Sequence, residues 1–367
     1  MKKRFIAFIL IFCIGTAALM GGGTGCAVAD GVISADILDS AAAYLLRNVE
    51  NPTVSSVGGE WTVIAIARSG RLPREYAEKY LVNLEKYLTE CGGALSERKY
   101  TEYSRVILAL TALGKNPQDA AGYDLTLPLG DFEGTVRQGI NGAIWALAAL
   151  DSGKYQIPKN SGAAVQASRE MYIDYILGRQ MPCGGFSLNS ASENADPDIT
   201  GMALVALAGY TDSENVAAAV DKAVEYLSLA QNENGGYESW GTENPESAAQ
   251  VLIGITSVGI SPHDSRFIKN GRTLIDNILS FARSDGGFEH ERGGGAGVMP
   301  TEQALCGLAA ALHFENGESG IFDMSAADKT EQNRINAAEL LWYIRIRRYT
   351  KGNVFLYNYV CGGSGQR

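Results

Sequence analysis

The pattern of apolar and polar positions repeats along the chain at a fixed interval. Segments 183–186, 234–237 and 285–288 each contain two glycines followed by an aromatic residue. Their second glycines are spaced by 51 residues (287 − 236 = 236 − 185). A regular period of this length indicates stacked supersecondary units that bury their apolar faces against one another.

Each unit predicts two helices joined by the Gly-Gly-aromatic turn. Apolar residues recur at helical spacing in 171–177, before the first turn, and a helix rich in small residues is predicted at 200–207, after it. Small-residue helices of this kind are apolar on most sides, so we expect them to be buried in an inner ring. Their partner helices keep a charged face, as in 266–283, and should form an outer ring.

The turns and helix starts carry local signals. Glycine provides the positive φ with which the chain can reverse, and the aromatic residue after it can cover the turn. Asp198, Glu246 and Thr301 stand where the small-residue helices begin, so we expect them to cap those helices.

Weaker copies of the turn occur earlier, at 58–61, 91–93 and 138–142. Together the copies predict about six helical hairpins over residues 35–326, enough to close a ring. The predicted fold is therefore all-α, an α/α toroid with inner and outer helix rings. Residues 327–367 break the pattern and are expected to form an appended basic and aromatic tail.

The N-terminus has the pattern of a targeting segment. A basic start is followed by an apolar run over residues 5–20 and by small residues, which predicts a signal peptide over residues 1–29. Ala29 would then precede the cleavage site. An alternative is a lipoprotein signal with lipid attached at Cys26. Both predict a secreted or extracellular protein, and the second anchors it to the membrane through lipid alone.

Composition narrows the class of protein. The chain is 46% hydrophobic and 20% charged, which excludes disorder. A net charge of −10 argues against a nucleic-acid partner. Three histidines and scattered cysteines give no metal-ligand spacing, so we predict no metal site. Cys306 lies in an apolar helical run and is expected to be a buried thiol.

Three segments carry a resemblance to a known family. Residues 180–186 and 231–237 begin with glutamine and end in Gly-Gly-Phe or Gly-Gly-Tyr, and 196–200 reads Asp-Pro-Asp-Ile-Thr before an Ala/Leu-rich helix. They resemble prenyltransferase and squalene oxidase repeats, with Phe or Tyr in place of the usual Trp. The resemblance implies the α/α toroid of squalene cyclases and protein prenyltransferases.

Within that superfamily, 101–114, 138–142 and 299–305 are similar to secreted bacterial relatives of the intrinsic factor and transcobalamin helical domain. This likeness implies cobalamin or another corrinoid as ligand, held between the toroid and a second, β-rich domain. Too few residues follow the toroid for a domain of ordinary size. A partner domain or surface protein would have to supply the remaining contacts.

The sequence predicts two groups of candidate site residues, one catalytic and one ligand-binding. Asp196 and Asp198 resemble part of the D-x-D-D motif of class II terpene cyclases, which implies Asp198 as general acid, although Ile199 replaces the final aspartate. The alternative is that Asp198 caps its helix. Phe186, Tyr237, Trp240 and Phe288 come from or near the repeated turns and could form a ligand-binding rim, the alternative being turn packing.

The sequence therefore favours an exported, non-catalytic binding module for a small hydrophobic or corrinoid ligand, with no cofactor certain. A class II terpene cyclase that uses Asp198 is the enzymatic alternative. A structural surface protein is the third.

Overall fold

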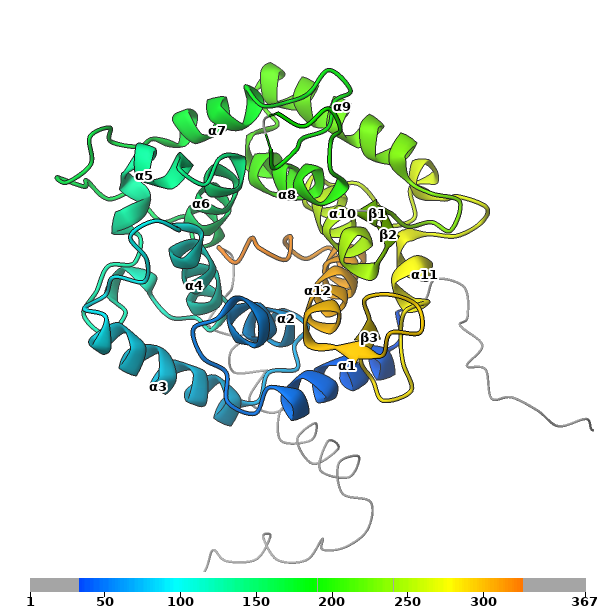
Figure 1. The fold of residues 1–367 in the computed structure, drawn as a ribbon, viewed down its shortest axis with the longest axis horizontal. Helices are drawn as coiled ribbons and strands as arrows, with labels where there is room; N and C mark the ends of the chain where they lie inside the picture. Colours follow the sequence, from blue (N-terminus) through cyan, green and yellow to red (C-terminus); the bar gives the residue numbers. More distant parts are fainter. Residues whose placement is uncertain (1–32, 190, 240, 326–367) are drawn as a thin grey trace, which may run out of the picture.

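The computed structural model describes residues 33–325, except 190 and 240. Its helices form a closed double ring, shown end-on in Figure 1. The inner ring contains α2 (Trp61–Arg68), α4 (Thr101–Ala112), α6 (Ile140–Ser152), α8 (Pro197–Leu207), α10 (Pro245–Ser257) and α12 (Val298–Glu315). The outer ring contains α1 (Ala35–Asn48), α3 (Arg74–Glu90), α5 (Phe132–Val136), α7 (Arg169–Leu177), α9 (Glu214–Ala230) and α11 (Leu274–Leu279). The predicted all-α toroid of about six hairpins is confirmed.

Short elements connect the rings. The antiparallel hairpin β1 (Glu238–Ser239) and β2 (Thr242–Glu243) precedes α10, and the hairpin β3 (Phe288–Glu289) and β4 (Ala296–Gly297) precedes α12. Single 3-10 turns are η2 (Pro117–Asp119), η3 (Leu127–Gly130), η4 (Ala208–Tyr210) and η5 (Ser265–Phe267). An irregular π-like turn, η1 (Ser56–Glu60), leads into α2.

Small residues let the inner helices approach one another, as the sequence predicts. A Cβ added to Gly254 of α10 would lie 2.6 Å from the carbonyl oxygen of Gly201 on α8. A Cβ on Gly307 of α12 would lie 2.9 Å from the Cα of Ala249 on α10. Any larger side chain at these crossings would force the helices apart.

The Gly-Gly turns pack each repeat closely against the next, and the last repeat against the first. The first glycines of the turns, Gly184, Gly235 and Gly286, have φ of 92°, 78° and 91°. A Cβ on Gly286 would lie 2.5 Å from the carbonyl oxygen of Ser40 on α1. The turn of the last hairpin therefore packs directly on the first outer helix, which helps to close the ring.

Glutamines of the repeat form hydrogen bonds between the same neighbouring repeats. Gln180 donates from Nε2 to the carbonyl oxygen of Ala219 on α9, at 2.7 Å. Gln231 donates from Nε2 to the carbonyl oxygen of Phe267 in η5, at 3.0 Å. These bonds explain in physical terms why glutamine recurs before the turn.

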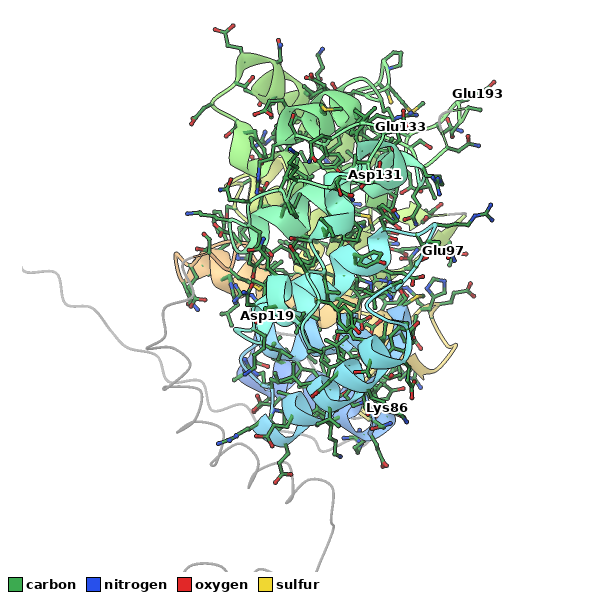
Figure 2. The ribbon with its side chains drawn as sticks, turned by 90° about the vertical axis from the view of Figure 1, so that its left-hand side faces the viewer. Lys86, Glu97, Asp119, Asp131, Glu133 and Glu193 are labelled. Atoms are coloured by element: carbon green, nitrogen blue, oxygen red, sulfur yellow. The ribbon has the colours of Figure 1, made fainter. Side chains whose placement is uncertain are left out.

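The toroid has two ends. We call the end at which the inner helices begin the N-terminal face, and the end at which they finish the C-terminal face. In the side view of Figure 2, Glu97, Glu133 and Glu193 lie toward one edge of the ring, in or beside segments that lead into inner helices, whereas Asp119, which follows α4, lies toward the other. No helix of the described residues is both long and apolar enough to cross a bilayer.

The predicted outer helix over 266–283 is wrong. Only α11 is helical in the second half of this segment, and its first half is a 3-10 turn followed by a chain reversal. Asn270 and Gly271 adopt φ of 51° and 76°, and Lys269 bridges back to Arg272. Positive φ at two successive residues is incompatible with a continuous α-helix.

The predicted helix caps are also wrong. Asp198, Glu246 and Thr301 lie inside their helices, each of which begins earlier. A proline takes the first helical position of α8 and α10, where its missing N–H breaks no hydrogen bond. The observed N-cap residues are Asp196, Asn244 and Gly297.

Candidate functional site

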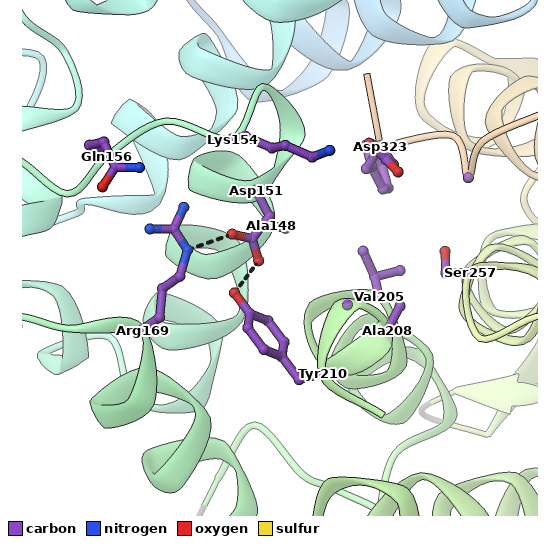
Figure 3. A pocket seen from close by; sticks show the side chains of 13 residues that line it. Ala148, Asp151, Lys154, Gln156, Arg169, Val205, Ala208, Tyr210, Ser257 and Asp323 are labelled. Carbon is purple, nitrogen blue, oxygen red and sulfur yellow. Dashed lines mark hydrogen bonds and ion pairs between the residues drawn. The ribbon is translucent and has the colours of Figure 1, made fainter. Parts of the chain in front are cut away.

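A pocket of about 550 Å³ opens at the C-terminal face. It lies where α6, α8 and α10 end and where the chain after α12 crosses the ring (Figure 3). Its walls combine charged and polar side chains with small apolar ones. The lining residues are Ala148, Asp151, Lys154, Gln156, Arg169, Val205, Ala208, Gly209, Tyr210, Ser257, Gly320, Phe322 and Asp323.

Asp151, in the last turn of α6, joins two neighbouring elements at the pocket wall. Its Oδ1 accepts a 2.8 Å hydrogen bond from Arg169 Nε, and its Oδ2 accepts a 2.7 Å bond from the Tyr210 hydroxyl (Figure 3). Burial, followed by the nearby Asp151 carboxylate, raises the pKa of Tyr210 above its ordinary range. The hydroxyl therefore stays protonated and holds its donor role at physiological pH.

Lys154 brings a charged group to the pocket from the turn after α6. It adopts φ of 55°, an uncommon conformation for a residue with a side chain, and its N–H donates to the Asp151 carbonyl oxygen at 3.1 Å. Figure 3 shows its side chain reaching across the pocket toward Asp323. Within the described chain, no hydrogen bond or ion pair engages the Lys154 ammonium.

The chain after α12 forms a strap, residues 317–325, across the middle of the ring (Figure 1). Arg68 Nε donates to the Ile321 carbonyl oxygen at 2.8 Å, and the Met324 N–H donates to the Ser152 carbonyl oxygen at 2.9 Å. Ile321 and Met324 are buried. The strap is therefore fixed to α2 on one side of the ring and to α6 on the other.

An aromatic cluster fills the centre of the ring beneath the strap. The rings of Trp61 and Trp145 have centroids 4.9 Å apart, and Phe322 of the strap lies 5.7 Å from Trp145 and 6.2 Å from Trp61. Edge and tilted contacts at these distances are favourable for aromatic side chains. Phe322 belongs both to this cluster and to the pocket lining, and it gives the pocket an apolar surface next to its polar groups.

The turn aromatics are buried inside the repeats. Phe186, Tyr237 and Phe288 have no exposed surface, and the Tyr237 hydroxyl donates to the Leu227 carbonyl oxygen at 2.7 Å. The turn-packing interpretation explains this burial, and these side chains present no surface to solvent. Ligand binding at these rings stays a prediction. Trp240, predicted with them, lies outside the described residues.

The structure separates the roles of the two predicted acids. Asp196 caps α8, since its Oδ1 accepts hydrogen bonds from the N–H groups of Asp198 and Ile199 at 2.8 and 3.2 Å. Asp198 is left free of a capping role, and its Oδ1 is buried without a partner among the described residues. Burial first, and the carboxyls of Asp196 and Glu246 as well, raise its pKa to about 6, while the Ser247 hydroxyl acts in the opposite direction. Whether it is catalytic stays a prediction.

Cys26, the predicted signal peptide over residues 1–29 and the whole predicted tail over residues 327–367 lie outside the described residues. Cys306 is buried in α12, as predicted, and burial raises the pKa of its thiol above the ordinary range. In the part of the chain that the structure describes, no cluster of three or more histidine, cysteine or acidic side chains has an arrangement that could hold a metal ion.

Sequence reasoning missed the pocket. Asp151, Lys154 and Tyr210 belong to no repeated motif, and they meet because several inner helices end at the same face. The sequence offers one signal: a lysine follows directly after Gly153, the glycine at the end of α6.

No family model matches the chain, and no curated protein matches it in sequence. Its similarity to known proteins is one of fold. The structure of Candida albicans protein geranylgeranyltransferase-I complexed with GGPP is 12% identical, with a TM-score of 0.50 over 83% of this chain and 98% of that chain. A glucuronyl hydrolase variant with the oligosaccharide dGlcA-Glc-Rha-Glc is also 12% identical, with a TM-score of 0.50 over 79% of this chain and 98% of the other.

The unsaturated glucuronyl hydrolase of Bacillus sp. GL1 is 13% identical, with a TM-score of 0.49 over 79% of this chain and 98% of that chain. The two similarities with a TM-score of 0.50 are at a level of identity that establishes the toroid fold alone. They agree with a prenyltransferase-like toroid. They give no support to the finer resemblance to intrinsic factor and transcobalamin.

Proposed function

We propose that the protein is an exported binding module, and that its ligand is a small organic molecule held in the pocket at the C-terminal face. The observation that carries this proposal is a cavity of about 550 Å³ in which the Lys154 ammonium, engaged by no hydrogen bond or ion pair of the described chain, reaches toward Asp323 beside apolar side chains. Ligand pockets of drug-sized molecules typically have volumes of about 300–1,000 Å³ and combine apolar walls with a few polar groups.

The lining favours a ligand with one anionic end and an apolar body. The Asp151 carboxylate already accepts hydrogen bonds from Arg169 and Tyr210, so both of its oxygens have a donor without a ligand. Lys154 has three free donors and a positive charge that a carboxylate would satisfy. Val205 and Phe322 would pack on the apolar part.

A corrinoid is the ligand that the family resemblance implies. Cobalamin, with its substituted macrocycle and nucleotide loop, is larger than a drug-sized molecule, so this pocket would accept only part of it. Full binding would require movement of the strap or contacts from a partner protein. We keep the corrinoid as a second ligand class to be tested in the same experiment.

The enzymatic alternative, a class II terpene cyclase, is favoured by one observation: Asp198 is a partly buried acid without a capping role and with a pKa of about 6. Its neighbours Ser247, Glu246 and His290 are polar. Alkene protonation needs a dry, apolar pocket around the acid, so these neighbours support the binding module better than the cyclase. Loss of polyprenyl conversion in Asp198→Asn would favour the cyclase.

Calorimetry with three probes tests the binding proposal. These are 4-phenylbutyrate, its neutral counterpart 4-phenylbutan-1-ol, and cobalamin. Lys154→Met removes the charge and keeps the stem, and Lys159→Met, at an exposed lysine outside the pocket lining, is the matched control. We expect Lys154→Met to weaken phenylbutyrate binding about tenfold, the size of one charge-assisted hydrogen bond, with alcohol binding unchanged. Absence of heat with all three probes, or equal affinity in both lysine variants, contradicts the proposal.

A further inference from the structure

Unsatisfied polar atoms gather on the N-terminal face, away from the pocket. Seven buried side-chain nitrogen or oxygen atoms in the described chain have no hydrogen-bond partner, and three of them are Asp198 Oδ1, Glu246 Oε2 and Ser247 Oγ. All three residues stand in the first turns of neighbouring inner helices, α8 and α10. Each buried polar atom left unpaired is unfavourable by about 1–3 kcal/mol, so this grouping indicates a place that gains partners when a ligand binds.

Local structure explains why these side chains are free. Asp196 and Asn244 cap the two helices, so the carboxyls of Asp198 and Glu246 are not needed for that role. Both acids occupy the second helical position, directly after a proline. The close crossing of the two helices at Gly201 brings their first turns together.

The charges at this place are unbalanced. Within the described residues neither Asp198 nor Glu246 forms an ion pair with an arginine or lysine, and the only basic partner is His290, whose Nδ1 lies 2.9 Å from Glu246 Oε1. Apart from burial, the charges that act on Asp198 are the carboxyls of Asp196 and Glu246, and both raise its pKa. The two carboxyls therefore give this place an excess of acidic over basic groups within the described residues.

Glu60, another buried carboxyl, shows the contrast. Glu60 has no exposed surface, and it receives hydrogen bonds from Arg105 Nε at 2.7 Å and from the Tyr80 hydroxyl at 2.9 Å. The oxygen bound by Arg105, Oε2, also accepts from the Ser55 N–H at 3.2 Å. Both oxygens of Glu60 thus accept hydrogen bonds from the protein. Asp198 and Glu246 each have one buried oxygen for which the described chain provides no donor.

We propose that Asp198, Glu246 and Ser247 form a binding site for the protonated primary amine of an organic ligand. An ammonium group carries three donors and one positive charge, which match the two carboxylates and the hydroxyl oxygen of Ser247, whose own proton is directed to Asp198. His290, which contacts Glu246 here, has a side chain about half exposed, so the place lies near the protein surface. It lies at the opposite end of the inner helices from the Lys154 pocket, so either site can exist without the other.

Amide chemical-shift titrations with three probes test this site, at a pH above the pKa of Asp198. The probes are n-butylammonium, butan-1-ol, which has no charge, and tetramethylammonium, which has the charge but no N–H donor. We expect n-butylammonium to bind with a Kd at least about tenfold lower than either of the others, as for a charge-assisted hydrogen bond. Equal affinity for butan-1-ol would show that the positive charge of the ligand is not recognised. Equal affinity for tetramethylammonium would show that its N–H donors are not recognised, and either result overturns the proposal.

Variants complete the test. Asp198→Asn should raise the Kd for n-butylammonium about tenfold or more, and Ser247→Ala, which removes one acceptor with little change in volume, should raise it by a smaller factor. Glu238→Gln, at an exposed acid on β1, is the matched control and should leave the Kd unchanged. A Kd that is the same in folded Asp198→Asn and Ser247→Ala as in the parent protein overturns the site.

Discussion

The Thr62 hydroxyl donates a 2.5 Å hydrogen bond to Glu302 Oε2, which joins residues 240 positions apart in the sequence. Thr62 lies in the first inner helix and Glu302 in the last, so this buried bond closes the inner ring. Glu302 is 1% exposed. Closure of the toroid thus depends on a carboxyl group that the fold has removed from water.

The buried carboxyl should make stability depend on pH. Burial, with the nearby Glu60 carboxylate, raises the pKa of Glu302 to about 7, against about 4.3 for an unfolded glutamate. Between these two values the folded state binds more protons than the unfolded state, so the free energy of unfolding falls as pH rises from about 4.3 through 7. The size of this loss is on the order of 3 kcal/mol.

Glu302→Gln isolates that contribution, because glutamine is a neutral group of the same shape. Denaturant unfolding across this pH range should show that the variant gains stability relative to the parent as pH rises. Carboxyls that do not interact with Glu302 act equally in both proteins and cancel in the difference, whereas the interaction with Glu60 is part of the measured effect. Parallel pH profiles for parent and variant would show that Glu302 does not titrate in this way.

Gly286 should be the more sensitive of two glycines with similar backbone conformation. Gly286→Ala combines a φ of 91° with a Cβ only 2.5 Å from the Ser40 carbonyl oxygen, so we expect a loss of about 3 kcal/mol. Gly293 has a φ of 85° and nothing within 4 Å of an added Cβ, so Gly293→Ala should lose about 1 kcal/mol. Chemical denaturation measures both, and equal losses would show that the contact with α1 is not needed for ring closure.

The N-terminus of the exported protein should start at Cys26 or at Asp30. Small residues precede both positions, and an apolar run precedes them in turn. Intact-mass spectrometry of the protein from its native host distinguishes a lipid-modified Cys26 from a released chain that begins with Asp30. A chain that retains Met1 would refute export by a cleaved signal.

The repeat explains why the fold could be predicted from the sequence. Gly184, Gly235 and Gly286 recur because each turn packs on the backbone of the next outer element, and the aromatic residue two positions later fills the space inside the turn. Because the same local requirement occurs in each repeat, the same residue types recur at a fixed spacing in the sequence. The predicted starts of α8 and α10 are too late, because each helix begins at a proline, which is favoured at the first helical position.

The residues that line the pocket follow no comparable pattern in the sequence. Asp151, Lys154 and Tyr210 come from the ends of different helices and turns, and Phe322 comes from a strap beyond the last repeat. Their proximity follows from ring closure, which brings the ends of distant helices to one face (Figure 3). A single sequence shows which helices exist more readily than which of their ends meet around a cavity.

A crystal structure of the protein with 4-phenylbutyrate bound tests the central proposal most directly, because it locates the ligand. We predict the carboxylate within hydrogen-bond distance of Lys154 Nζ and the phenyl ring against Phe322, between the strap and the ends of α6, α8 and α10. A ligand bound instead at the N-terminal face, beside the Gly-Gly-aromatic turns, would contradict the proposed pocket and favour the rim predicted from the sequence.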